Sequence, residues 1–386
     1  MHSRLGRLGI LRALIMPWLC VGTAAWAQTD SGHRFSGYFK SLLSHSTTLF
    51  PTQQSYNLDL NRLRLELRGQ ISRALAYEIQ YDNEILLGSY LRTPQFGLQK
   101  SMRAPQRWQL EHAYADSPDV FARHRLYRGF MTFSSGATDI RIGRQRIALG
   151  TGRFWSPLDI LNPISPIQLE REERLGVDAV LIERKLGALS RASGIYAPRR
   201  GGADPSAALY WHGNSAGADF SLMAGKFAGD RVFGGDVATQ LGDAGLRGEI
   251  THTEPADGKN YRRVLLGLDY AFANTLTLSA ELYYNGAGAS GPDRYDFAAL
   301  LDGRIRSLGQ RYLGMFGSYE ITPLLKTQNH FVINLQDNSR YFGPSLTYSL
   351  NESVDWTLGA QLFSGGGRSE HGRISNVYYT QVQWFF

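Results

Sequence analysis

Cysteine is almost absent from this chain of 386 residues. The single cysteine, Cys20, lies in an N-terminal segment with the features of a secretory signal: three arginines precede an apolar run, and Ala25-Trp26-Ala27 forms an A-x-A cleavage site. We expect residues 1–27 to be removed after Sec-type export. The mature chain, residues 28–386, would then have no disulfide, no thiolate metal site and no cysteine nucleophile.

Long apolar runs and a large net charge are also missing. After the signal, no apolar stretch reaches the roughly 18 residues that a membrane-spanning helix needs. The net charge is +7, and subtracting the three signal arginines leaves +4, too little to favour nucleic-acid binding. Aromatic residues nevertheless make up 12% of the chain. This combination is typical of an outer-membrane β-barrel, whose alternating strands hide their hydrophobicity from any window average.

Spacings that would indicate catalysis or metal binding are absent as well. The nine histidines form no metal-ligand or catalytic-triad pattern. His45 and Ser46 are adjacent, so on a strand they point to opposite faces and cannot act as a pair. We therefore expect no catalytic residue, no metal and no cofactor.

The clearest positive signal is a pair of alternating segments between residues 62 and 82. Leucines at 63, 65 and 67 share one face of the first segment, and charged residues share the other. The second segment, residues 75–82, alternates in the same way after a short turn. Each arm runs about ten residues, longer than an ordinary strand, and its polar face carries many charges. The pattern favours a hairpin between lipid and a water-filled lumen.

The rest of the chain extends this pattern to an all-β, transmembrane antiparallel β-barrel of about 18 strands. Short periplasmic turns alternate with long extracellular loops at about residues 83–122, 150–176 and 285–310. A strand-like piece at 107–115 is assigned to the first loop, because counting it as spanning would place the second long loop on the periplasmic side. Both termini are then periplasmic.

The last residues form an alternating strand that ends in phenylalanine. Such an ending resembles the signal read by the bacterial barrel-assembly machinery, and pairing of the last strand with the first would leave no open edge. The residues assigned to this signal are Tyr378, Val382, Trp384 and Phe386.

The stretch from Tyr127 to Glu183 resembles a known family. It contains YRGFMTF, DIRIGRQRIALGTGRFWSPLDILNP and ERLGVDAVLIE, and this order is similar to the alginate-export-type porins of Gram-negative outer membranes. The resemblance implies an 18-stranded channel for a polar, often anionic, solute. It does not identify alginate as the solute, because the arginine positions of alginate exporters have no one-to-one match here.

The polar faces of two hairpins supply the candidate pore-lining residues. Two interpretations stay open: an arginine ladder that selects anions, or a network of arginines and carboxylates that stiffens the wall. Strict alternation turns Arg144 and Arg146 toward lipid unless they lie near the interface or a bulge at Gly143 re-aims them. The candidates are Arg62, Arg64, Glu66, Arg68, Glu78, Asp82, Arg141 and Gln145.

The long segment at 150–176 is the candidate constriction loop. Its length, prolines and aromatics favour an ordered loop folded into the barrel, although a charge run can also be a solvated loop surface. Its aromatics could stack on a sugar or anchor the loop to the wall. The residues assigned to it are Arg153, Phe154, Trp155, Asp159, Glu170, Arg171 and Arg174.

The sequence therefore predicts a porin-like channel of the Gram-negative outer membrane for diffusion of a polar, anionic solute of small or oligomeric size. A plugged barrel that serves as a docking or adhesion platform is the alternative, followed by a lipid-modifying barrel enzyme. The expected partners are outer-membrane lipid and lipopolysaccharide, the assembly machinery and the solute, without nucleic acid. The direction of transport and the oligomeric state stay open.

Overall fold

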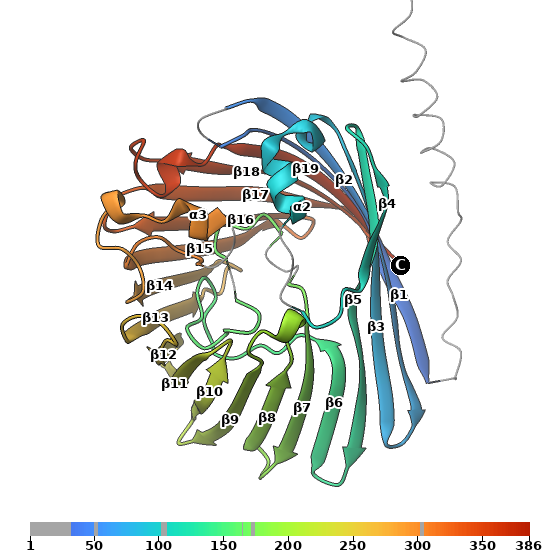
Figure 1. Ribbon diagram of the computed structural model, residues 1–386, viewed down its shortest axis with the longest axis vertical. Coiled ribbons are helices and arrows are strands. Elements are labelled where there is room, and N and C mark those ends of the chain that lie inside the picture. The colour runs from blue at the N-terminus through green and yellow to red at the C-terminus, as the bar shows by residue number, and fades with distance from the viewer. Residues whose placement is uncertain (1–31, 50–52, 102–105, 164, 171–173, 302–304) are drawn as a thin grey trace, which may run out of the picture.

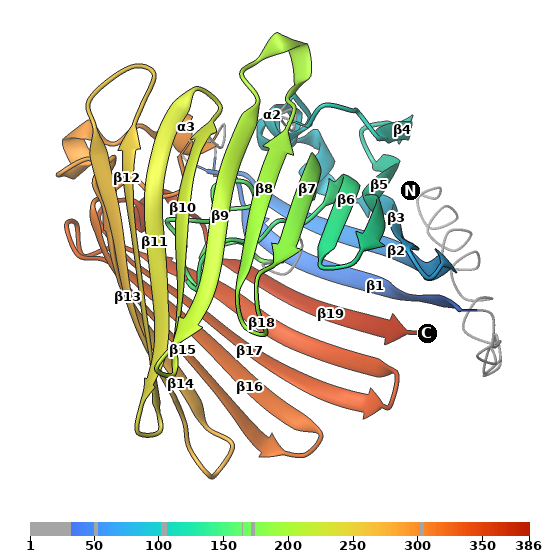
Figure 2. The same ribbon diagram turned by 90° about the horizontal axis from the view of Figure 1, so that it is seen from below.

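The computed structural model describes residues 32–49, 53–101, 106–163, 165–170, 174–301 and 305–386. The predicted signal peptide, 1–27, and the candidate residue Arg171 lie outside these ranges. The strands of the described chain form one antiparallel sheet (Figures 1 and 2). They are β1 (His33–Thr47), β2 (Ser55–Ser72), β3 (Leu75–Leu87), β4 (Glu111–Asp116), β5 (Val120–Ser135), β6 (Thr138–Gln145), β7 (Val177–Lys185), β8 (Arg191–Ala197), β9 (Ser206–Ser215), β10 (Ala218–Phe227), β11 (Asp230–Leu241), β12 (Ala244–Glu254), β13 (Tyr261–Ala271), β14 (Thr277–Asn285), β15 (Arg311–Thr322), β16 (Leu325–Asn334), β17 (Arg340–Asn351), β18 (Val354–Ser364) and β19 (Val377–Phe385).

The sheet closes on itself. β1 pairs with β2 on one side and with β19 on the other, and Gly37 and Phe386 exchange backbone hydrogen bonds of 2.8 and 3.1 Å. Closure removes the exposed strand edges that lipid could not hydrogen-bond. The predicted all-β antiparallel barrel is confirmed.

One strand of the 19 does not span the barrel wall. β4 pairs with β5 over Phe121–Arg125, whereas β6 pairs with β5 only from Gly129 to Ser135. β4 therefore completes the wall above the point where β6 ends. The other strands of the described chain number 19 − 1 = 18, so the predicted count, with residues 107–115 kept inside a long connection, is confirmed.

Alternation sorts side chains between the two faces of the wall as the sequence predicts. On the hairpin β2–β3, Arg62, Arg64 and Asp82 are buried on the inner face, while Ile71 and Ile79 are 60% and 41% exposed on the outer face. An outer face this rich in exposed aliphatic and aromatic side chains needs lipid around it. Within the described residues, no helix is both long and apolar enough to cross a membrane.

The connections at the two ends of the barrel differ in length. The short-turn end includes residues 73–74 and 136–137, and the long-loop end carries short helices in its connections. These helices are η2 (Ser89–Arg92), α2 (Pro94–Ser101), η3 (Arg200–Gly202), η4 (Pro292–Arg294), α3 (Phe297–Leu301) and η5 (His371–Arg373).

The predicted bounds of the first two long loops were inaccurate. β3 continues to Leu87 and β5 starts at Val120, so 83–87 and 120–122 belong to strands. Glu84 is the one charged residue of these two segments, and its ion pairs to arginines of β2 and β5 hold it within the sheet. The second connection starts earlier than predicted, at residue 146, because β6 ends at Gln145.

The connection between β6 and β7, residues 146–176, is called the inner loop below. Figure 1 shows it, in green, within the ring of strands. Ile147, Leu149 and Leu158 pack on the inner faces of strands around β7–β11, and Phe154 and Trp155 pack toward β13–β17. The inner loop therefore occupies the β7–β17 side of the interior.

Candidate functional site

The inner faces of β2, β3 and β5 carry a dense network of ion pairs. Arg64 binds Asp82 through two hydrogen bonds of 2.6 and 2.8 Å, and Arg125 adds contacts of 3.2 Å to the same carboxylate. Glu84 lies within 2.7–3.0 Å of nitrogens of Arg62, Arg123 and Arg125. Charge-assisted bonds of this kind are strong, and each carboxylate here neutralises more than one cation.

The inner loop joins this network through Glu170. Its carboxylate receives Arg62 Nη1 at 2.7 Å, Arg62 Nη2 at 2.9 Å and Lys40 Nζ at 2.9 Å. Burial raises the pKa of Glu170, but the charges of Arg62 and Lys40 outweigh it, and the net pKa is lowered. Glu170 therefore stays ionised and ties the loop to β1 and β2.

Two carboxylates of the opposite wall hold the loop backbone. Glu249 on β12 accepts N–H groups of Thr151 and Gly152 at 2.5 Å and the hydroxyl of Ser156 at 2.9 Å. Glu281 on β14 accepts the N–H groups of residues 153 and 154 at 2.7 and 2.9 Å, and a guanidinium nitrogen of residue 247 at 2.8 Å. The turn at 151–158 is thereby fixed to the wall, because buried N–H groups need such acceptors.

Aromatic packing completes the attachment of the loop. The indole of Trp155 stacks on Tyr283 with ring centroids 5.1 Å apart, and Phe154 lies beside it at 5.8 Å. Gly314 on β15 leaves space for both rings, since a Cβ there would lie 2.9 Å from each. Phe154 and Trp155 are 2% and 3% exposed, so the arrangement matches the anchoring alternative and leaves no open ring face for a sugar.

The other predicted loop residues lie at different depths. Asp159 is buried beside Arg174 at 3.2 Å, and burial raises its pKa to about 7. Arg153 is largely exposed and contacts Asp269 at 3.3 Å. Asp159 and Arg174 therefore stabilise the fold of the loop, whereas Arg153 extends from it.

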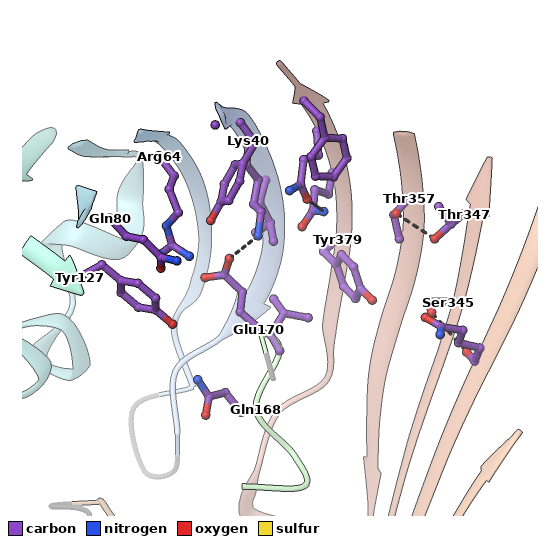
Figure 3. A pocket seen from close by; sticks show the side chains of 18 of the residues that line it. Lys40, Arg64, Gln80, Tyr127, Gln168, Glu170, Ser345, Thr347, Thr357 and Tyr379 are labelled. Atoms are coloured by element: carbon purple, nitrogen blue, oxygen red, sulfur yellow. Dashed lines mark hydrogen bonds and ion pairs between the residues drawn. The ribbon is translucent and has the colours of Figure 1, made fainter. Parts of the chain in front are cut away.

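A cavity of about 920 Å³ remains on the β1–β5 and β16–β19 side of the interior. Figure 3 shows Lys40, Arg64 and Tyr127 on one side of it and a row of hydroxyl groups on the other, with Glu170 and Gln168 of the inner loop between them. Its cationic lining residues are Arg34, Lys40, Arg64, Arg68, Arg128 and Arg146. Amide and hydroxyl groups on the facing wall include Gln328, Ser345, Thr347, Thr357, Gln361, Gln381 and Gln383.

Some of these cations are neutralised and others are not. Arg68 lies 3.2 Å from Glu66 and 3.3 Å from Glu78. Arg34, Arg128 and Arg146 have no carboxylate within 4.0 Å among the described residues, and the charge of Arg146 acts on Asp159 from a greater distance. The buried Nε of Arg128 has no acceptor among these residues either. The cavity therefore has a positive side and a neutral polar side.

The structure separates the predicted pore-lining residues into two groups. Arg64, Glu66 and Arg68 line the cavity. Arg62 and Asp82 are 3% and 0% exposed inside the ion-pair network behind it, and Glu78 lies beside Arg68. The prediction that they border open water is wrong for Arg62 and Asp82, because neighbouring ion-pair partners cover them.

Strand β6 also differs from the prediction. Gln145 is fully buried and donates to the backbone oxygen of Ala179 at 3.1 Å, so it does not line the cavity. Arg141 lies over the ring of Phe130 at 5.0 Å. Arg144 is not in lipid: it is 4% exposed and binds Asp178 at 2.9 Å.

The lipid-facing alternative for Arg144 is excluded by the local backbone. Gly143 has φ +128°, and a Cβ there would lie 2.3 Å from the backbone oxygen of Gly129. Only glycine adopts this conformation readily, and it marks the position where β6 leaves regular alternation. The carbonyl of Trp108, from the connection before β4, accepts Arg144 Nη2 at 2.6 Å and covers the pair.

Several residues of the site were missed from the sequence. Glu84 and Arg125 share the inner face with predicted residues, and the alternation of β3 and β5 could have found them. A register shift between β3 and β5, where Tyr81 pairs with Leu126, obscured that signal. Glu249 and Glu281 are isolated charges in alternating strands, and no sequence signal connects them with a loop about 100 residues away.

The predicted assembly residues lie on the outer face of β19. Tyr378, Val382, Trp384 and Phe386 are 52%, 43%, 39% and 40% exposed. They border the seam where β19 meets β1. Their recognition by the assembly machinery stays a prediction.

No family model and no curated protein matches this chain. Several solved structures do match its fold. OccAB1 of Acinetobacter baumannii matches with a TM-score of 0.61 and 10% identity over 93% of this chain and 98% of that one. OccK2 (OpdF) of Pseudomonas aeruginosa, in complex with glucuronate, has a TM-score of 0.56 and 11% identity over 92% and 98%. OpdK of the same species, with vanillate, has a TM-score of 0.57 and 7% identity over 92% and 98%.

These neighbours are outer-membrane channels rather than enzymes. The fold of this chain matches the folds of these channels. The resemblance of residues 127–183 to alginate-export porins is therefore not supported. At identities near 10%, the match extends to the fold and not to the residues of a site. The chain thus has the closed 18-stranded β-barrel fold of the Occ-type outer-membrane channels.

Proposed function

We propose that this protein is an outer-membrane channel for diffusion of small solutes that carry a carboxylate. The observation that carries the proposal is the pair of unneutralised arginines, Arg128 and Arg146, on the cavity wall. A guanidinium offers two parallel N–H donors that fit a carboxylate. Charged groups in a lumen also set the preference for ions of opposite sign.

The wall across the cavity supports the same conclusion. Hydroxyl and amide groups there, such as Ser345, Thr357 and Gln361, can hydrogen-bond the neutral polar part of a solute. A solute with a carboxylate at one end and hydroxyl groups at the other would contact both sides. The structural neighbours OccK2 and OpdK, solved with glucuronate and vanillate, bind ligands of this chemical class.

Size supports a small solute over an oligomer. The cavity of about 920 Å³ is of the order that a single small molecule occupies. The inner loop fills the β7–β17 side, which leaves no broad passage there. The narrowing by Glu170 next to Lys40 and Arg62 would make passage depend on charge.

Proteoliposome uptake of glucuronate against glucose tests the proposal, because the two solutes have similar size and differ in the carboxylate. Wild-type protein should admit glucuronate faster. The variant Arg128→Ala/Arg146→Ala should lose that preference. Each cation is worth about 1 kcal/mol in a water-filled lumen, or roughly fivefold in rate.

A matched control removes two arginines from the outer face of the wall, Arg311→Ala/Arg340→Ala. It changes the net charge by the same amount and should leave the preference unchanged. Equal uptake of the two solutes by the wild-type protein would refute the proposed carboxylate preference. A preference that survives in Arg128→Ala/Arg146→Ala would show that other residues select the solute.

A further inference from the structure

We propose that four arginines on the outer face, Arg231, Arg262, Arg311 and Arg340, form a binding site for the phosphate groups of lipopolysaccharide. The site lies at the long-loop end of β11, β13, β15 and β17, and these four residues are called the arginine rim. The inference rests on the outer-membrane placement in the proposed function, with the long loops toward the cell exterior. It does not depend on the solute.

Each arginine of the rim faces outward. On β11, β15 and β17 the next residue is buried, as Val232 and Tyr341 show, whereas Arg263 on β13 is half-buried. Since successive side chains of a strand alternate, each arginine shares the outer face with the apolar residue two positions on, which is exposed on β11 and β17 and half-buried on β13 and β15. All four arginines are exposed.

The register places the four arginines at one height in the membrane. Arg311 pairs with Tyr284, which pairs with Val264, two residues beyond Arg262. Arg340 pairs with Ile333, which pairs with Leu313, two residues beyond Arg311.

The step from Arg231 on β11 to Arg262 on β13 has the same stagger. Arg231 pairs with Glu254, and Arg262 pairs with His252, two residues before it on β12. The stagger is thus one residue per strand, always in the same sense. With about 3.3 Å per residue and 4.8 Å between strands, a line of constant height has this stagger when strands tilt by about 35°.

The same geometry sets the spacing. Successive arginines are two strands and two residues apart, which gives about 12 Å between their Cα atoms. Transmembrane barrel strands tilt by roughly 35–45°, so the row follows the edge of the membrane. An apolar row that includes Phe233, Leu313 and Phe342 lies directly below the rim, toward the membrane interior.

The four arginines lack acidic partners within the described residues. None of them has a carboxylate within 4.0 Å there, in contrast to the neighbouring Lys226, which binds Asp204 at 3.0 Å. The one acidic residue opposite the rim is Glu254, which lies 3.9 Å from His252. Four free guanidinium groups above an apolar band match a lipid with phosphates on its headgroup and acyl chains below.

The opposite side of the barrel lacks this feature. There the outer ends of β1 and β2 present His45, Asn57 and Asp59, with His45 bound to Asn57 at 2.8 Å. If the arginines served only to mark the membrane boundary, they would be expected around the whole wall. Their restriction to consecutive odd-numbered strands from β11 to β17 instead defines a local binding surface.

The test compares wild-type protein with the variant Arg231→Gln/Arg262→Gln/Arg311→Gln/Arg340→Gln. Lipopolysaccharide that co-purifies from outer membranes is counted per barrel, and binding of diphosphorylated lipid A to the delipidated barrel is titrated in detergent. We expect at least a tenfold loss of affinity in the variant, and weaker binding to the wild type as salt rises. Lipid A without its phosphates should bind both proteins equally.

A control variant, Arg73→Gln/Arg184→Gln/Lys185→Gln/Arg191→Gln, removes the same charge near the short-turn end and should bind like the wild type. Inorganic phosphate is titrated as a competitor, and it should not displace lipid A at millimolar concentration. Folding is checked by heat-modifiable gel mobility. The double variant Arg262→Gln/Arg311→Gln removes only two of the four rim arginines and should lose less affinity for lipid A. Unchanged lipid A binding in both rim variants would overturn the proposal. Glucuronate uptake should stay normal in them, so failure here is separate from failure of the channel assignment.

Discussion

Replacing Glu249 and Glu281 together by alanine is expected to release the inner loop from the wall and raise single-channel conductance several-fold. The two carboxylates accept the N–H groups of Thr151, Gly152 and Arg153, among others. Hydrogen bonds to a charged group contribute about 1.5–3 kcal/mol each. Loss of the whole set removes more free energy than the packing of one loop turn can replace.

Planar-bilayer recordings would measure this directly. The matched control is Glu320→Ala/Glu352→Ala, which removes two exposed carboxylates near the short-turn end and should conduct like the wild type. Intermediate conductance is expected for either single replacement, since one anchor stays. If the double variant conducts like the wild type, the two glutamates do not hold the loop in the lumen.

The second large effect is a dependence on pH at the long-loop end. Glu370, in the connection between β18 and β19, is 3% exposed and accepts the N–H of Leu308 at 2.9 Å, the hydroxyl of Tyr312 at 2.7 Å and Asn334 Nδ2 at 2.8 Å. It therefore links its own connection to the connection before β15 and to the ends of β15 and β16. Burial raises the pKa of Glu370 to about 7.

The sign of the effect follows from this raised pKa. The packed state binds the proton of Glu370 more tightly than an opened state with a pKa near 4.5, so the contribution of Glu370 to packing is full below pH 4.5 and is lost as the pH rises through 7. The full difference amounts to roughly 3 kcal/mol. The neighbouring His371 opposes part of this effect. Burial lowers the pKa of His371 from 6.5 to about 4, so the opened state binds that proton more tightly and the contribution of His371 to packing is lost as the pH falls below 6.5.

Amide hydrogen exchange of residues 305–310 and 365–376 should therefore speed up between pH 5 and pH 8.5, after correction for intrinsic exchange. Glu370→Gln keeps the size of the side chain and removes the titration. Only His371 then titrates, so the corrected exchange of the variant should slow as the pH rises through 6.5. A Glu370→Gln variant with the same pH dependence as the wild type would contradict the role of Glu370.

The sequence predicted the barrel because alternation is a local property. The leucines at 63, 65 and 67 show which face of β2 meets lipid without knowledge of any partner strand. The same rule placed Arg64 and Arg68 toward the interior, and the cavity includes both. The strand count followed from parity, since every long connection had to lie at one end.

The sequence could not predict which inward charges face water and which are neutralised, because this depends on pairs that are far apart in the chain. Lys40 and Glu170 lie 130 residues apart. Arg62, the first candidate of the ladder, is covered by Glu84 and Glu170, whereas the cavity cations without an ion pair among the described residues are Arg34, Arg128 and Arg146. The arginine and carboxylate network is thus present on the inner faces of β2, β3 and β5, and arginines without ion pairs line the cavity beside it; their selection of anions stays a prediction.

The covering of the end of β6 by the connection before β4 had no local signal either. Gly143 and Arg144 look like a lipid-facing error in the alternation until the connection around Trp108 covers them. A short strand that completes the wall above another strand is a tertiary feature. The sequence indicates it only indirectly: counting residues 107–115 as a spanning strand would place the next long loop on the periplasmic side, and for this reason they were excluded from the spanning strands.

The most direct test of the channel assignment is the reversal potential of single wild-type barrels in a planar bilayer under a salt gradient. The account predicts stable conductance with a preference for anions, reduced in Arg128→Ala/Arg146→Ala. A folded barrel that conducts without anion preference would contradict the role of the positive cavity wall. A folded barrel that does not conduct at all would contradict the open channel and favour a plugged barrel used for docking.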